Sequence, residues 1–134
     1  MDIGKENSGA KLVVSDKRMT HGPDSFRDDA DRYRITLRAS QYSNIHLHGE
    51  FLEITLDGKS FAVNHFDNLG YALADSEKYD VVCFGHNHRY EVRKKGRTLV
   101  VNPGEIFGGL SEDQTATFVL FDTFSGEAEC CRIQ

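Results

Sequence analysis

The sequence has few cysteines, no long apolar run and no excess of basic residues. Its three cysteines are an odd number, and two of them are adjacent, so they do not form a disulfide framework. The longest apolar run is far too short to cross a membrane, and no charged-then-apolar signal segment opens the chain. The net charge of −5 argues against non-specific binding to nucleic acid. We therefore expect a cytoplasmic protein whose partner is neither a membrane nor a nucleic acid.

What remains is the composition of an ordinary globular protein. Charged residues make up 28% of the 134 residues and hydrophobic residues 39%. A chain of this length is sufficient for one domain with a single core. A negative net charge does not exclude a phosphorylated substrate, because bound metal ions would reverse the local sign.

The most informative stretch is a buried strand followed by two histidines. Four apolar residues in a row, Val81 to Phe84, predict a strand that is buried on both faces. Gly85 ends the run, and His86 and His88 follow with one residue between them. In extended backbone these two side chains would point to the same side. They would leave the carboxyl end of the strand, where open α/β sheets bind their ligands.

A second polar stretch follows another apolar run. Asn102-Pro103-Gly104-Glu105 comes directly after Thr98 to Val101. An Asn-Pro-Gly sequence at the end of a strand is typical of a tight turn that presents its backbone. We expect this turn and the two histidines to form one site.

Turn signals and periodicity predict the other elements. Asp57-Gly58 predicts a hairpin of strands 51–56 and 59–64. Residues 67–76 predict a helix whose buried side comprises Leu69, Tyr71, Ala72 and Leu73. Further strands are expected at 12–15, 79–84, 91–93, 97–101, 115–121 and 128–133. Residues from Asp24 or Ser25 to Leu37 have helical spacing, although the last part also alternates as a strand would.

The order of these motifs resembles a known family. His65, then Gly85-His86-Asn87-His88, then Asn102-Pro103-Gly104 resembles the C-terminal signature of calcineurin-like metallophosphoesterases, in particular the small bacterial and archaeal phosphodiesterase branch. The resemblance covers roughly residues 45–133. It implies an α/β fold, a partial α/β/β/α metallophosphoesterase sandwich. The corresponding domain would comprise residues 23–134, preceded by a poorly matched N-terminal segment of residues 1–22.

The resemblance also implies a chemistry. Family members hydrolyse phosphoesters with two divalent ions (Mn, Zn, Ni or Fe), and the substrate here would be a phosphodiester or a phosphorylated small molecule. By motif match, His65 and His86 would bind one metal and His88 the other. Asn102 and Gly104 would contact the substrate. Fewer than two ions are conceivable in this chain, and no catalytic acid or base is assigned.

The early metal ligands of the family do not map onto this sequence. Asp16 and His21 echo the family's first Asp-x-His, but three additional residues separate them. Between Gly22 and Gly49 there is neither a Gly-Asp nor a Gly-Asn element. A bridging carboxylate is therefore missing, and we expect a truncated or diverged member with weak metal binding and slow or absent hydrolysis.

Alternative interpretations remain open. The chain could be a non-catalytic scaffold or binding module on the phosphoesterase fold, or a partner chain could complete the site. His86 and His88 could be plain polar residues at a strand end, and His46 and His48 are expected at the surface. Loss of the family's first strands would also expose an edge of the strand at 81–84. Such an edge favours self-association unless Leu12 to Ser15 covers it.

Overall fold

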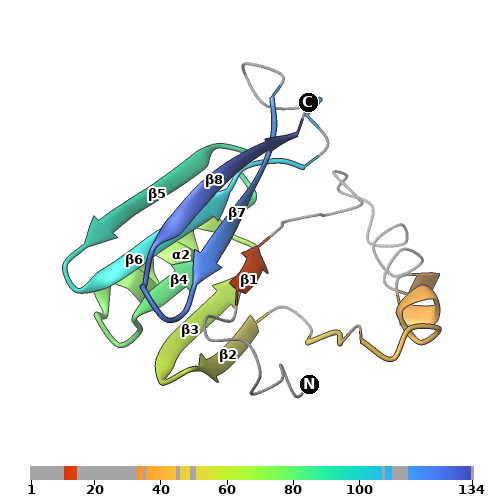
Figure 1. Cartoon of the computed structure of the whole chain (residues 1–134), viewed down its shortest axis with the longest axis horizontal. Helices are drawn as coiled ribbons and strands as arrows, with labels where there is room; N and C mark the ends of the chain where they lie inside the picture. Colours follow the sequence, from red (N-terminus) through yellow and green to blue (C-terminus); the bar gives the residue numbers. More distant parts are fainter. Residues whose placement is uncertain are drawn as a thin grey trace.

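The fold is built from two β-sheets and one well-defined helix. The computed structural model describes residues 11–14, 33–34, 36–44, 46–48, 51–106, 108–109 and 115–133. The larger sheet has the strand order β2-β3-β4-β6-β5 and the smaller one β1-β7-β8 (Figure 1). The elements are β1 (Lys11–Val14), β2 (Phe51–Leu56), β3 (Lys59–Asn64), α2 (Asp67–Asp75), β4 (Val81–Cys83), β5 (Tyr90–Lys95), β6 (Thr98–Pro103), β7 (Ala116–Asp122) and β8 (Ala128–Ile133).

The centre of the larger sheet is parallel. β3 pairs with β4, and β4 pairs with β6, both in parallel register. The outer strands β2 and β5 are antiparallel to their neighbours. Helix α2 connects β3 to β4, so these two strands and the helix form a βαβ unit. Because the two strands are parallel, their carboxyl ends lie at the same edge of the sheet.

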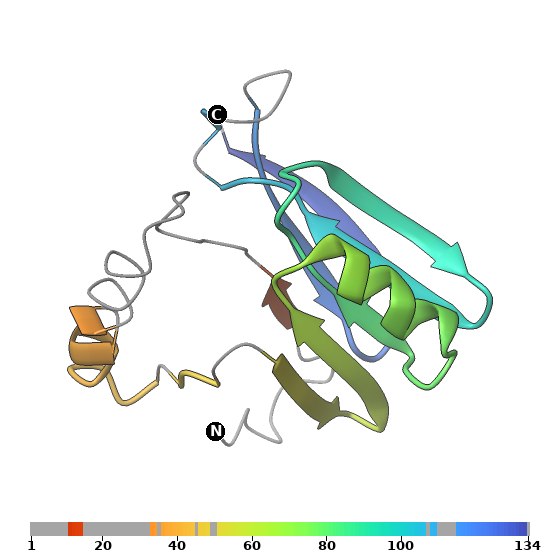
Figure 2. The same ribbon diagram turned by 180° about the vertical axis from the view of Figure 1, so that it is seen from behind.

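The larger sheet lies between the smaller sheet and helix α2, which bury its two faces. One face packs against the smaller sheet, with Phe61, Val81 and Cys83 contacting Val119 and Phe121 of β7. The Phe61 and Phe121 rings meet edge to face, with centroids 5.4 Å apart. The other face packs against α2, which lies across the strands in Figure 2. The predicted α/β class is confirmed.

Local turn signals predicted the hairpins correctly. Asp57 and Gly58 have φ values of 47° and 77°, which the tight turn between β2 and β3 requires. The strand pairs β5–β6 and β7–β8 are also confirmed. The short strand expected near Leu12 is β1, which pairs with β7. Residues 33–34 and 36–39 are helical, so the helix predicted up to Leu37 is confirmed in its described part and continues to Ala39. Residues 24–32 lie outside the described part of the chain.

Two local predictions are wrong in detail. Of the residues predicted on the buried side of α2, Tyr71 and Leu73 pack against the core, whereas Leu69 is 44% exposed and Ala72 is also exposed. The fully buried residues of the helix are Gly70 and Ala74. The helix approaches the sheet so closely that a Cβ on Gly70 would lie 2.1 Å from Cδ1 of Phe84. In addition, the Asn-Pro-Gly sequence is not wholly a turn.

Asn102 and Pro103 belong to β6, where Pro103 is opposite Tyr90 of β5. The backbone departs from the strand only at Gly104, which has a φ of 77°.

The third correction concerns the edge argument. Because β4 lies between β3 and β6, both of its edges are paired, so an exposed strand at 81–84 gives no reason for self-association.

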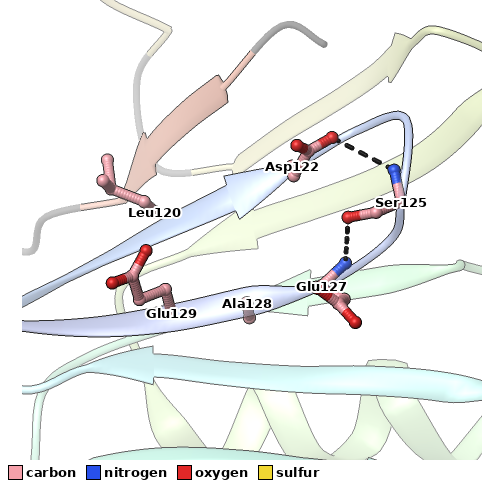
Figure 3. Close-up of a pocket in the computed structure, with 6 residues that line it drawn as sticks. All are labelled: Leu120, Asp122, Ser125, Glu127, Ala128 and Glu129. Atoms are coloured by element: carbon pink, nitrogen blue, oxygen red, sulfur yellow. Dashed lines mark hydrogen bonds between the residues drawn. The ribbon is translucent and has the colours of Figure 1, made fainter.

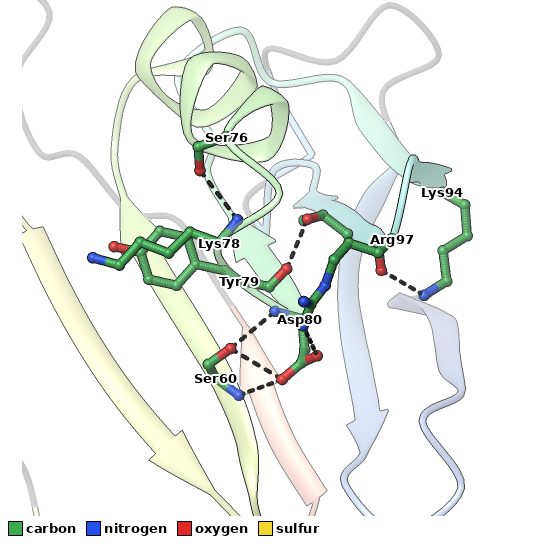
Figure 4. A network of polar contacts seen from close by, with 8 residues as sticks. Ser60, Ser76, Lys78, Tyr79, Asp80, Lys94 and Arg97 are labelled. Carbon is green, nitrogen blue, oxygen red and sulfur yellow. Dashed lines mark hydrogen bonds and ion pairs between the residues drawn. The ribbon is translucent and has the colours of Figure 1, made fainter.

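A polar network fixes the amino ends of the central strands (Figure 4). Asp80 Oδ2 accepts hydrogen bonds from the Ser60 backbone N–H at 2.8 Å and from its hydroxyl at 3.0 Å. Asp80 Oδ1 accepts one from Arg97 at 3.2 Å. The Ser60 backbone N–H, followed by its hydroxyl, holds the pKa of the Asp80 carboxyl below its ordinary value of 3.8. The network therefore joins β3, β4 and β6 at the edge opposite the histidines.

No helix in the described part of the chain is long and apolar enough to span a membrane.

Candidate metal centre

The candidate site lies at the carboxyl ends of β3 and β4. His65 directly follows β3, and His86 follows β4 by three residues. The two loops are joined through their backbones, because the Gly85 N–H donates to the His65 carbonyl at 3.1 Å. The parallel pairing of the two strands therefore brings together two histidines that are 21 residues apart in the sequence.

The two imidazoles face each other through their nitrogens. His65 Nε2 lies 3.1 Å from His86 Nδ1, and the ring centroids are 5.1 Å apart. Without a metal ion this is one hydrogen bond, in which one ring donates its N–H to the other. The predicted proximity of His65 and His86 is thus observed.

His88 differs from the prediction. The same-side argument assumed extended backbone, but His86 and His88 have φ values of 69° and 59°, in the left-handed region. Within the described residues, no group of three or more His, Cys, Asp or Glu side chains is arranged to hold a metal ion. The expected convergence of three histidines is therefore observed for two. The roles of His65, His86 and His88 as ligands stay predictions.

Asn102 holds the histidine loop in place. Its buried Nδ2 donates to the Gly85 carbonyl at 3.3 Å and to Asn87 Oδ1 at 2.8 Å. Its Oδ1 accepts from the Gly104 N–H at 3.0 Å. All of these bonds are internal to the protein, so the structure gives the Asn102 side chain a positioning role. Its contact with a substrate, like that of Gly104, stays a prediction.

Two residues of the site, Asn87 and Phe66, were missed by sequence reasoning. Asn87 connects the loop to α2 by donating to Asp67 Oδ2 at 3.3 Å, and its Oδ1 accepts from the Arg89 N–H. Phe66 packs against both histidine rings. The sequence signals that could have identified them are the position of Asn87 between two histidines and the position of Phe66 directly after His65.

The remaining histidines and early candidates lie elsewhere. His46 and His48 are exposed, as predicted. Asp16 and His21 lie outside the described residues, so their role as ligands stays untested.

A surface pocket at the β7–β8 hairpin is chemically different (Figure 3). It has a volume of about 510 Å³, and its lining residues are Leu120, Asp122, Ser125, Glu127, Ala128 and Glu129. Asp122 Oδ1 accepts from the Ser125 N–H at 3.1 Å, which organises the turn. Three carboxylates around one pocket repel an anionic phosphate, so this pocket does not suit a phosphoester.

Comparison with known proteins identifies the family. The sequence model of the calcineurin-like phosphoesterase superfamily domain matches residues 16–126. This match covers most of the chain, and the protein therefore belongs to the calcineurin-like phosphoesterase superfamily. The resemblance derived from the histidine and Asn-Pro-Gly motifs is confirmed.

Individual relatives agree with this assignment. The chain is 25% identical over 108 residues to phosphodiesterase MJ0936 of Methanocaldococcus jannaschii, covering 79% of this chain and 60% of that protein. The structure of an archaeal phosphodiesterase superposes with a TM-score of 0.69 and 24% identity, over 79% of this chain and 64% of the other. The chain thus spans less than two thirds of the length of either protein.

A more distant structural neighbour is hypothetical protein PH1004 of Pyrococcus horikoshii. Its TM-score is 0.53 and its identity 14%, over 63% of this chain and 40% of that protein. The structural neighbours show that the chain has the metallophosphoesterase-like α/β fold, and its mixed five-stranded sheet matches this fold.

Proposed function

We propose that this chain contributes the histidine half of a metal-dependent phosphodiesterase site. The observation that carries the proposal is the 3.1 Å approach of His65 Nε2 to His86 Nδ1 at the carboxyl ends of two parallel strands. This edge is where α/β sheets bind their ligands. Family membership and the similarity to an archaeal phosphodiesterase support the reaction class.

The two histidines fit a shared divalent ion. Nitrogens bound to one zinc ion at about 2.0–2.1 Å in tetrahedral geometry lie about 3.3 Å apart. The observed separation of 3.1 Å is close to this value. Imidazole nitrogens suit Zn, Ni and Fe and bind Mn less strongly, so the histidine pair alone does not identify the metal.

The bound metal would activate a water and neutralise negative charge on the phosphoryl oxygens. In this arrangement His65 and His86 would hold one ion, and His88 would be available to a second. Asn102 and Asn87 fix the loop that carries two of these histidines. No carboxylate within the described residues joins the histidine pair in a metal-binding cluster. We therefore expect weak binding and slow hydrolysis by this chain alone.

Hydrolysis of bis(p-nitrophenyl) phosphate with added Mn²⁺ tests the activity. We expect a low metal-dependent rate that His86→Ala abolishes and that His46→Ala, a substitution of an exposed histidine, leaves unchanged. A rate that survives His86→Ala would overturn the proposed site. Metal binding without any metal-dependent hydrolysis would instead favour a non-catalytic binding module on the same fold.

A further inference from the structure

Phe66 places an aromatic ring against both histidines of the candidate centre. Its ring centroid lies 5.0 Å from that of His65 and 5.1 Å from that of His86, in edge contacts. The residue is nevertheless 38% exposed. Part of an apolar ring therefore faces solvent directly beside the pair of imidazole nitrogens.

The backbone fixes Phe66 in this place. Asn64 Oδ1 accepts a hydrogen bond from the Phe66 N–H at 2.8 Å. The Phe66 carbonyl accepts from the Gly70 N–H at 2.9 Å, at the start of α2. Among the described residues, the buried Asn64 Nδ2 has no hydrogen-bond partner, so the Asn64 side chain is held through the hydrogen bond that its Oδ1 accepts from the Phe66 N–H.

We propose that Phe66 is a specificity residue that selects phosphoesters whose ester group carries an aromatic ring, either an aryl group or a nucleobase. This inference rests on the proposed function. The phosphate would lie at the His65–His86 pair, and the aromatic group of the ester would pack against the exposed part of the Phe66 ring. Aromatic contacts of this kind favour an aromatic ligand over an aliphatic one by about 2- to 10-fold.

The test measures binding and does not depend on turnover. Zn²⁺ affinity is first determined by calorimetry for the wild type, Phe66→Leu and the control Phe124→Leu. Phe124 is 83% exposed in the β7–β8 turn, remote in sequence from the site. Zn²⁺-loaded proteins are then titrated with two pairs of ligands: phenyl phosphate with methyl phosphate, and uridine 5′-monophosphate with ribose 5-phosphate.

We expect the wild type and Phe124→Leu to prefer the aromatic member of a pair, and Phe66→Leu to lose about 2- to 10-fold of that preference while its Zn²⁺ affinity changes by less than about 2-fold. A loss confined to the phenyl pair identifies aryl esters, and one confined to the nucleotide pair identifies nucleobases. An unchanged preference in Phe66→Leu with Zn²⁺ bound overturns this inference alone. An equal weakening of all four ligands together with Zn²⁺ overturns it in favour of a structural role. A wild type that binds no metal overturns the proposed function and this inference with it.

Discussion

The backbone at His86 and His88 is strained. Both have positive φ values, which cost a residue with a Cβ about 1–2 kcal/mol each relative to the right-handed region. Such strain persists only where surrounding contacts determine it, and it clusters at functional sites. Here the contacts are the hydrogen bonds from Asn102 to Gly85 and Asn87, on either side of His86.

Cys83 shows how burial controls the reactivity of a single residue. Its side chain is fully buried between the sheets, and burial raises the pKa of its thiol to about 12. Cys130 and Cys131 on β8 are only partly buried. In the folded protein at pH 8 we expect Ellman's reagent to modify these two before Cys83, which should react only after unfolding. Mass spectrometry of partially labelled protein identifies the sites, and early labelling of Cys83 would contradict the buried position of β4.

At the scale of elements, Asn102 joins the end of β6 to the loop after β4. Asn102→Ala removes three internal hydrogen bonds of a buried side chain, each with a net contribution of about 0.5–1.5 kcal/mol. We expect the free energy of unfolding, measured by urea denaturation, to fall by about 2–4 kcal/mol. Zn²⁺ affinity should fall as well, because the loop that carries His86 loses its support.

Asn68→Ala is the matched control. Asn68 is exposed in the first turn of α2, where its Oδ1 accepts from the Leu69 N–H at 2.8 Å. The higher helix propensity of Ala offsets the loss of this exposed bond, so the same change of side chain should alter stability by no more than about 0.5 kcal/mol. If Asn102→Ala were as mild as this control, the loop would be held by other contacts.

The sequence predicted those features that local rules determine. Asp57-Gly58 predicted its hairpin because a two-residue turn requires positive φ values at these positions. The left-handed backbone at His86 and His88 could not be predicted in this way, because the loop that carries them is bonded at Gly85 and Asn87 to Asn102, a residue distant in sequence. The buried side of α2 was predicted only in part: Tyr71 and Leu73 pack against the core, but the burial of Gly70 depends on a close approach to Phe84 that a Cβ would prevent.

At the scale of the whole molecule, the paired histidines lie at the carboxyl ends of the central strands, and the Asp80 network lies at their amino ends. The pKa of Asp80 is lowered in the folded protein, so its ionised form stabilises the fold above pH 3.8. This contribution is lost as the pH falls below 3.8 and through the lower folded-state pKa. The Asp80 side chain is 38% exposed, and screening by water limits the contribution to about 1 kcal/mol.

We therefore expect Asp80→Asn to lower the free energy of unfolding at pH 7 by about 1 kcal/mol and to have less effect at pH 3. Denaturant titrations at the two pH values measure the difference. Asp75→Asn changes the charge equally at a more exposed carboxylate paired with Lys95, and serves as the control. An equal effect of Asp80→Asn at both pH values would show that the carboxylate is not stabilised in its ionised form.

The central claim is that His65 and His86 share a divalent ion. Calorimetric titration of the chain with Zn²⁺ tests it most directly, in parallel with the single variants His65→Ala, His86→Ala and His46→Ala. We expect weak binding that falls at least about 10-fold when either His65 or His86 is replaced and is unchanged for His46→Ala. Binding that is equally strong in all four proteins, or two tightly retained equivalents that survive the loss of either His65 or His86, would contradict the shared ion.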